Sequence, residues 1–195
     1  MPHSSCIDLD ASVRAELLAI ARRSIEAGQA VNSEPGIDLD GLDETMRIPS
    51  AVFVTLTQAG ALRGCIGSLE ARDPLAQAVS RAAFNAAYRD PRFPPLTVAE
   101  FSQTQIEISV LSPFEPVVAP SRQSLLEQLR PGVDGLVIED AGRRATFLPK
   151  VWEKIASPED FLQQLFLKAG LSPGHWSEGL AVKRYTTETF AEAVD

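Results

Sequence analysis

Two β-hairpin patterns constrain the fold of this chain more strongly than any other feature of its sequence. The first covers residues 51–69 with a turn at 58–60, and the second covers residues 135–148 with a turn at 140–142. Runs rich in β-branched and aromatic residues on either side of a glycine-containing turn are typical of hairpins. Each hairpin is followed by helical patterns and then by a strand pattern. We therefore expect an α+β fold with two lobes, built from two structural repeats of β-hairpin, helices and strand.

Shorter patterns predict the remaining elements. Apolar residues at helical spacing indicate a helix over residues 10–27, which Gly28 can end. Asp73 and Pro74 have the form of the cap and first residue of a second helix, and Thr97 and Glu100 have the spacing of a capping box. We also expect helical segments at 121–129, 149–155 and 158–170, and strands at 103–111 and 180–186.

The length and composition suit one domain. A chain of 195 residues that is 45% hydrophobic can bury a sizeable core. We expect a single domain over residues 1–195, with approximate lobes at 10–118 and 119–190 and short tails at 1–9 and 191–195. Residues 32–49 lack periodicity and predict a long loop. Its acidic residues leave cation binding open as an alternative, although the spacing of a calcium loop is absent.

Charge and cysteine usage exclude several classes of function. A formal charge of −8 argues against a nucleic-acid partner, because phosphate binding draws on clustered Lys and Arg. Cys6 and Cys65 are the only cysteines, so we expect no structural disulfide and a reducing compartment. His3 and His175 are far apart, and their spacing predicts no metal site. No apolar run approaches the ~20 residues that span a bilayer, so we expect a cytoplasmic protein without membrane contact.

The segment 62–69, Leu-Arg-Gly-Cys-Ile-Gly-Ser-Leu, is the strongest candidate site. Arg63 and Cys65 are two residues apart on the expected strand, so their side chains should lie on the same face. An adjacent cation favours the thiolate, which is the reactive form of cysteine. Gly64 and Gly67 mark places where a ligand or a second backbone can come close. The alternative is that Cys65 is a small buried hydrophobe and Arg63 a solvated strand residue.

Two further segments carry candidate residues. Prolines stiffen residues 88–96, so Asp90 and Arg92 are presented by a rigid loop, although such a pair is more often a local ion pair. Clean alternation over 103–111 places Glu107 on a strand face. Glu107 could act as a general base or a metal ligand if that face borders Cys65. The alternative is that Glu107 is solvated or paired with an arginine, as a strand glutamate usually is.

Together these motifs resemble the AMMECR family, whose prokaryotic members are called AmmeMemoRadiSam system protein A. The resemblance covers about residues 15–190, and it is carried by segments 62–69, 90–96, 106–111, 135–138, 147–149 and 168–171, with Trp176. It implies a two-lobed AMMECR-like fold. It also implies a Memo-like protein and a radical S-adenosylmethionine enzyme as partners, and it brings no particular reaction with it.

Two hypotheses for function follow from the candidate residues. In the first, Cys65 acts as nucleophile, redox group or metal thiolate in a cleft between the lobes, with Arg63 and Glu107 as catalytic partners and with substrate contacts from Asp90, Arg92, Gly64 and Gly67. The sequence contains neither a phosphate loop nor a dinucleotide fingerprint, so it names no cofactor. In the second, the chain is a binding or assembly module for the same partners, without chemistry of its own.

Overall fold

The computed structural model describes residues 9–31 and 33–193, which divide into two compact units. The first unit comprises residues 9–111 and 188–193, and the second comprises residues 112–187. Cys6 and His3 lie outside the described residues. Each unit contains one four-stranded sheet with helices, so the expected α+β class is confirmed.

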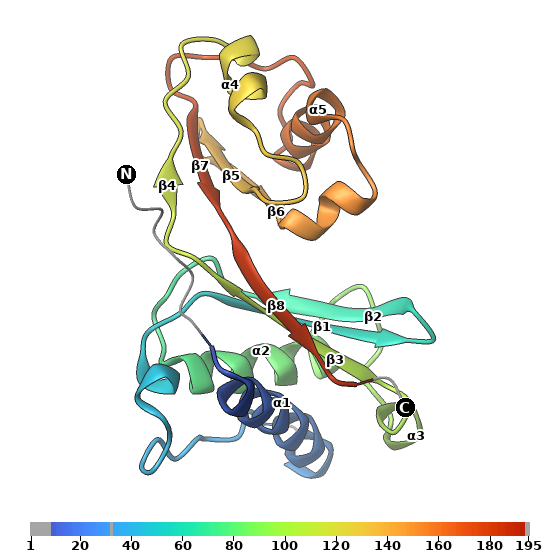
Figure 1. Cartoon of the computed structure of the whole chain (residues 1–195). Coiled ribbons are helices and arrows are strands. Elements are labelled where there is room, and N and C mark those ends of the chain that lie inside the picture. The colour runs from blue at the N-terminus through green and yellow to red at the C-terminus, as the bar shows by residue number, and fades with distance from the viewer. Residues whose placement is uncertain (1–8, 32, 194–195) are drawn as a thin grey trace. The chain divides into compact units, whose positions relative to one another are not determined.

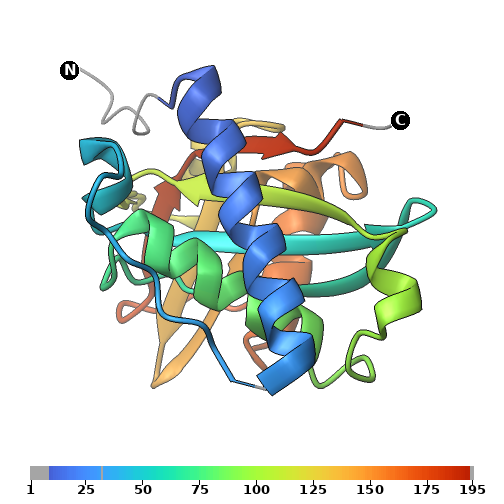
Figure 2. The same cartoon turned by 90° about the horizontal axis from the view of Figure 1, so that it is seen from below.

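The sheet of the first unit has the strand order β2-β1-β3-β8 (Figure 1). Its strands are β1 (Val52–Gln58), β2 (Ala61–Gly67), β3 (Gln105–Leu111) and β8 (Thr187–Ala191). Two helices, α1 (Ala11–Val31) and α2 (Leu75–Tyr88), lie across one face of this sheet (Figure 2). The short helices η1 (Glu44–Arg47) and α3 (Val98–Phe101) lie in the connections. The predicted hairpin at 51–69 is therefore confirmed, and β2 is an edge strand of the sheet.

The core of the first unit lies between this sheet and its two helices. Alternate residues of the central strands are buried against the helices, as the alternation over 103–111 predicts: Val52, Val54 and Leu56 on β1, and Ile106, Ile108 and Val110 on β3. The other set of side chains on these strands faces the opposite, helix-free side of the sheet. This helix-free face carries the candidate cysteine described below.

Helix α1 continues past Gly28 to Val31, so the prediction that Gly28 ends it is wrong. A Cβ atom at Gly28 would lie 2.6 Å from Cε2 of Tyr88 and 2.8 Å from Cδ2 of Phe84, both on α2. The glycine is therefore needed for the close approach of two helices rather than for a turn.

The helix starts differ slightly from the sequence patterns. Helix α2 begins at Leu75 with Pro74 as its cap residue, one position later than predicted, and the carboxylate of Asp73 instead accepts a hydrogen bond from Arg81 at 2.5 Å. The capping box of α3 is confirmed, because Thr97 Oγ1 accepts the backbone N–H of Glu100 and the carboxylate of Glu100 accepts the N–H of Thr97.

The sheet of the second unit has the strand order β4-β7-β5-β6. Its elements are β4 (Glu115–Pro116), α4 (Arg122–Gln128), β5 (Gly135–Asp140), β6 (Arg143–Phe147), η2 (Pro149–Glu153), α5 (Pro158–Lys168) and β7 (Ala181–Tyr185). In its core the ring of Trp152 stacks on that of Phe161 with centroids 3.8 Å apart, and the indole N–H of Trp152 donates to the carbonyl of Asp134. The second hairpin and its helices thus form where the sequence predicts them.

The two sheets share one arrangement, which confirms the expected structural repeat. In each sheet the first hairpin strand (β1 or β5) pairs with its hairpin partner on one side and with a later strand (β3 or β7) on the other. In each, a fourth strand (β8 or β4) then lies beside that later strand. The sequence patterns do not indicate these two outer strands: β4 falls in the proline-rich segment 112–120, and β8 follows directly after β7.

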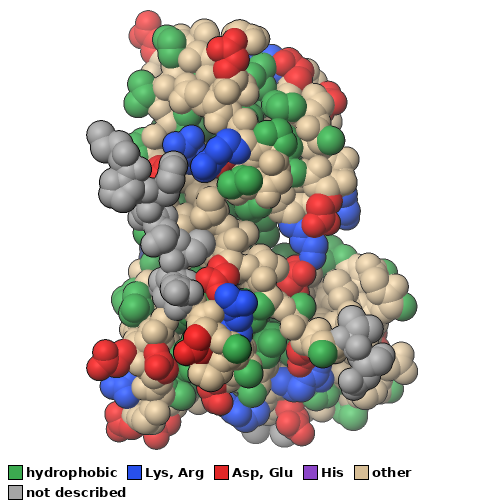
Figure 3. Space-filling view, in the orientation of Figure 1, with side chains coloured by type: hydrophobic (Ala, Val, Ile, Leu, Met, Phe, Trp, Pro, Cys, Tyr) green, Lys and Arg blue, Asp and Glu red, His purple; other side chains and the backbone are tan. Residues whose placement is uncertain are grey.

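Much of the basic charge is already paired within each unit. Acidic and basic side chains are interspersed over the visible surface of both units (Figure 3). Arg14 pairs with Glu188 at 2.8 Å in the first unit, and Arg130 pairs with the fully buried Asp134 at 2.6 Å in the second. In the described part of the chain, no helix is both long enough and apolar enough to cross a membrane.

Candidate functional site

A β-bulge shapes the segment that carries Cys65. Leu56 on β1 pairs with Gly64, but the next residue, Thr57, pairs with Leu62, so Arg63 is the extra residue on β2. An extra residue breaks the alternation of side chains along the strand. The expectation that Arg63 and Cys65 lie side by side assumed a regular strand, whereas the side chain of Arg63 reaches Glu100 and Pro94 and the sulfur of Cys65 meets Thr55.

Arg63 is buried and ties β2 to the loop before β3. Its guanidinium donates from Nε to Glu100 Oε1 at 3.0 Å and from Nη2 to the carbonyl of Pro94 at 2.9 Å. The same guanidinium, helped by hydrogen bonds from Thr97, lowers the pKa of Glu100 to about 2. Among the described residues Nη1 of Arg63 finds no hydrogen-bond partner. These contacts give Arg63 a role in packing, and they direct its charge toward Glu100.

Cys65 lies on the helix-free face of the first sheet. It pairs with Thr55 on β1, and the hydroxyl of Thr55 donates a hydrogen bond to its Sγ at 3.4 Å. Thr55 pairs in turn with Glu107 on β3. Cys65, Thr55 and Glu107 therefore form a row across three neighbouring strands, and all three side chains are half-buried. We call these residues the thiol row.

The backbone of Cys65 is held by the Asp90–Arg92 pair of the rigid loop. Its N–H donates to Asp90 Oδ2 at 2.9 Å, and its carbonyl accepts from Arg92 Nη2 at 3.1 Å. The two loop residues also form a bidentate ion pair, from Nε to Oδ1 at 2.9 Å and from Nη2 to Oδ2 at 2.7 Å. The structure thus brings Asp90 and Arg92 to the backbone of Cys65.

This pairing shifts the pKa values of both loop residues. Hydrogen bonds from Arg92, and then from the N–H of Cys65, hold the pKa of the buried Asp90 well below its usual range. The pKa of Arg92 is raised, chiefly by its hydrogen bond to Asp90 and further by its interaction with Cys65. The guanidinium that contacts Cys65 is therefore that of Arg92, through the carbonyl oxygen of Cys65, whereas Arg63 contacts Glu100 and Pro94.

The two candidate glycines lie where backbones come close. A Cβ atom at Gly64 would lie 2.2 Å from the carbonyl oxygen of Ala86 on α2, and one at Gly67 would lie 2.2 Å from the carbonyl oxygen of Val52 on β1. Both positions therefore exclude a side chain for packing reasons. Their predicted contact with a substrate stays a prediction.

Two residues of this region, Thr55 and Glu100, were not predicted from the sequence to belong to a site. Thr55 is an unremarkable strand residue in sequence, and only the pairing register places its hydroxyl beside the sulfur. Glu100 has the signature of a helix cap, which it is, and its second bond to Arg63 depends on tertiary folding. The pairing register of the hairpin would have predicted that Thr55 lies opposite Cys65. The bulge shifts this register by one residue, so counting from the turn gives the wrong partner.

Other candidate ligands are engaged elsewhere. In the second unit His175 contacts the carboxylate of Asp140, which also accepts a hydrogen bond from Ser177 at 2.6 Å. These two contacts lower the pKa of Asp140, Ser177 more than His175. In the loop before β1, Asp43 caps η1 by accepting the N–H of Thr45. Among the described residues no three His, Cys, Asp or Glu side chains gather as a metal site would need.

The fold and the thiol row define an α+β protein with two sheets of matching strand order and a cysteine held by a loop ion pair. The family model for AMMECR1 matches residues 18–190. The chain therefore belongs to the AMMECR1 family, as the sequence motifs indicate.

Relatives and a solved structure agree with this assignment. A protein of Methanothermobacter thermautotrophicus is 38% identical over 183 residues, covering 90% of this chain and 92% of the relative. A protein of Thermofilum pendens is 38% identical over 202 residues, covering 94% and 92%. The crystal structure of the uncharacterized protein PH0010 from Pyrococcus horikoshii matches with a TM-score of 0.87 and 33% identity, covering 94% of this chain and 93% of that one.

Proposed function

We propose that Cys65 is the nucleophile of a site on the helix-free face of the first sheet. We further propose that the protein acts in the cytoplasm alongside a Memo-like protein and a radical S-adenosylmethionine enzyme. The observation that carries the chemical part is the hydrogen bond from Thr55 Oγ1 to Cys65 Sγ at 3.4 Å. A donor aimed at sulfur favours the thiolate, which is the form that attacks.

The surrounding residues support this role. The Asp90–Arg92 pair fixes the backbone of Cys65 on both sides of its Cα, so the thiol has a defined position. The guanidinium of Arg92 adds positive charge beside the thiolate. Glu107 lies on the same face, next to Thr55 in the row, and adds a carboxylate to the surface on which the thiol lies.

The proposed step is the attack of the thiolate on an electrophilic carbon. The thiol first loses its proton to solvent, a sulfur–carbon bond then forms, and the leaving group departs with its electron pair. Arg63, which the sequence suggested as the catalytic cation, has no part in this step because its charge is committed to Glu100. Its place is taken by Arg92.

Alkylation with iodoacetamide tests the proposal, because it forms a sulfur–carbon bond and releases iodide. In Cys6→Ser protein, which leaves a single thiol, folded Cys65 should react at pH 7 faster than glutathione, followed by intact mass. Thr55→Val should slow the reaction several-fold. The matched control is Thr57→Val, two residues further along the same face of β1.

A Cys65 that reacts no faster than glutathione, or that is indifferent to Thr55→Val, removes the nucleophile proposal. The alternative of a binding or assembly module then stands. Gel filtration of the protein mixed with a Memo-like protein tests the partner separately. Complex formation by both the native protein and Cys65→Ala, together with an inert thiol, identifies the assembly role.

A further inference from the structure

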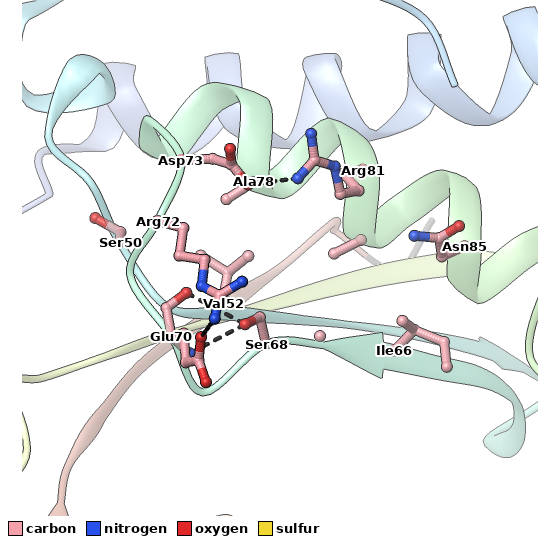
Figure 4. Close-up of a pocket in the computed structure, with 12 residues that line it drawn as sticks. Ser50, Val52, Ile66, Ser68, Glu70, Arg72, Asp73, Ala78, Arg81 and Asn85 are labelled. Atoms are coloured by element: carbon pink, nitrogen blue, oxygen red, sulfur yellow. Dashed lines mark hydrogen bonds and ion pairs between the residues drawn. The ribbon is translucent and has the colours of Figure 1, made fainter. Parts of the chain in front are cut away.

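A groove with a volume of about 250 Å³ lies between α2 and the end of the edge strand β2 in the first unit (Figure 4). Its floor is apolar and formed by Val52, Ile66, Ala78 and Ala82. Asn85 lies at one end of the groove beside Ile66, and Ser50 and Asp73 lie at the other end. Cys65 is not among its lining residues, so this groove is distinct from the thiol row.

The strand edge beside the groove presents backbone groups. At Cys65 the N–H and carbonyl point away from β1, because they bond to Asp90 and Arg92. Backbone groups of an antiparallel strand alternate in direction, so those of Gly67, two residues further on, point outward as well. Gly67 lines the groove and has no side chain to shield its backbone. An unpaired edge of this kind is a template for another strand.

The α2 side of the groove matches a peptide in two ways. Ala78, Ala82 and Asn85 lie at helical spacing on one side of α2. Along the groove, this side of the helix therefore presents two small apolar side chains and then one side-chain amide. A side-chain amide offers both a donor and an acceptor, as Gly67 does with its backbone. Two such donor-and-acceptor pairs on opposite walls complement the peptide groups of an extended chain.

Charge at the rim favours an uncharged occupant. Arg81 pairs with Asp73 at 2.5 Å and with Glu34 at 2.9 Å. Arg72 pairs with Glu70. These cations and anions neutralise one another, and the floor between them is apolar, so a charged group entering the groove would lose hydration without gaining a free counterion.

We propose that the groove binds an extended, uncharged peptide segment of a partner protein. The segment adds as a strand to β2 at Gly67 and places an aliphatic side chain over Ala78 and Ala82. Main-chain hydrogen bonds then supply affinity, and the apolar floor supplies specificity. This site needs no contribution from Cys65, so it stands independently of the proposed nucleophile.

Nuclear magnetic resonance of the ¹⁵N-labelled full chain tests the proposal with acetyl-Thr-Val-Val-Val-Thr-amide as the probe. We expect saturable shift changes at the backbone amide of Gly67 and at the side-chain NH₂ of Asn85. Ala78→Leu fills the groove and should weaken binding by about tenfold or more. Ala99→Leu, at an exposed alanine on α3, is the matched control and should leave the affinity unchanged.

Three results would overturn the proposal: no saturable shift at Gly67, equal affinity in Ala78→Leu, or binding of isobutyramide without binding of the peptide. The last would identify a small-molecule amide site instead. Should Ala78→Leu lose its folded spectrum, Asn85→Ala serves in its place, because the half-buried Asn85 lies outside the core. It should weaken peptide binding several-fold, and unchanged affinity in that variant contradicts the proposed amide contact.

Discussion

Asp90 accepts the backbone N–H of Cys65 at 2.9 Å, so a loop carboxylate occupies the position that the carbonyl of a further strand would take. Arg92 likewise takes the position of a neighbouring strand's N–H, because it donates to the carbonyl of Cys65 at 3.1 Å. Exposed strand edges invite pairing with other chains, and natural proteins cover them in several ways. Here one ion pair covers the edge at Cys65 and at the same time fixes the position of its thiol.

This relationship predicts a large effect of Asp90→Asn. The change removes the charge that Arg92 pairs with, and it puts an NH₂ group where one of two acceptors stood. We expect the free energy of unfolding to fall by about 2 kcal/mol at pH 7, as measured by urea denaturation. Asp40→Asn, at an exposed aspartate of the loop before η1, is the matched control and should change it by less than about 0.5 kcal/mol. Equal effects would show that the ion pair does not stabilise the edge.

A second prediction concerns the pH dependence of the Arg63–Glu100 pair. The folded pKa of Glu100 is about 2, against an ordinary value of 4.5, so its ionised form stabilises the folded state. That contribution is complete above about pH 4.5 and is lost as the pH falls toward 2. Because 34% of the Glu100 side chain is exposed and solvent screens the pair, we expect Glu100→Gln to cost about 1 kcal/mol at pH 7.

The measurement is the difference in unfolding free energy between native protein and Glu100→Gln at several pH values. The difference should be constant above pH 5 and should shrink below pH 4.5. Asp90 also has a lowered pKa, but it titrates in both proteins and cancels. A difference that grows on acidification would contradict the assigned direction of the Glu100 shift.

Gly64 supplies a third prediction. A Cβ there would lie 2.2 Å from the carbonyl oxygen and 3.1 Å from the carbonyl carbon of Ala86, and these backbone atoms of α2 cannot move aside cheaply. We expect Gly64→Ala to lower the free energy of unfolding by about 3 kcal/mol. Gly36→Ala is the control, because nothing lies within 4 Å of its added Cβ, and it should stay within about 0.5 kcal/mol. Similar stability of the two variants would mean that α2 does not depend on close approach to β2.

Local patterns in the sequence predict most of the fold, because hydrophobic alternation and helical spacing are local properties. They fail where a residue serves a distant partner. Gly28 has the form of a helix stop, yet it is retained for contact with Tyr88. The outer strand β8 depends on pairing with β3, far away in sequence, and no pattern within residues 187–191 reveals that pairing.

The candidate site shows the same limit. Cys65, Asp90 and Arg92 are each visible in sequence as unusual residues, and the structure brings them together. Which cation accompanies the thiol was not predictable, because a single extra residue on β2 redirects Arg63 toward Glu100. A bulge costs little energy and leaves no reliable local signature, so side-chain direction beyond it is set by tertiary contacts.

The last prediction separates a positioned thiol from a core residue. Cys65 is half-buried on the helix-free face, so Cys65→Ala should lower the free energy of unfolding by less than about 1 kcal/mol while abolishing alkylation in Cys6→Ser protein. Ile108→Ala, at a fully buried position on β3 facing the helices, should cost about 2 to 5 kcal/mol. A loss in Cys65→Ala as large as that in Ile108→Ala would mean that the sulfur is there for packing, since an accessible group leaves little cavity when it is removed.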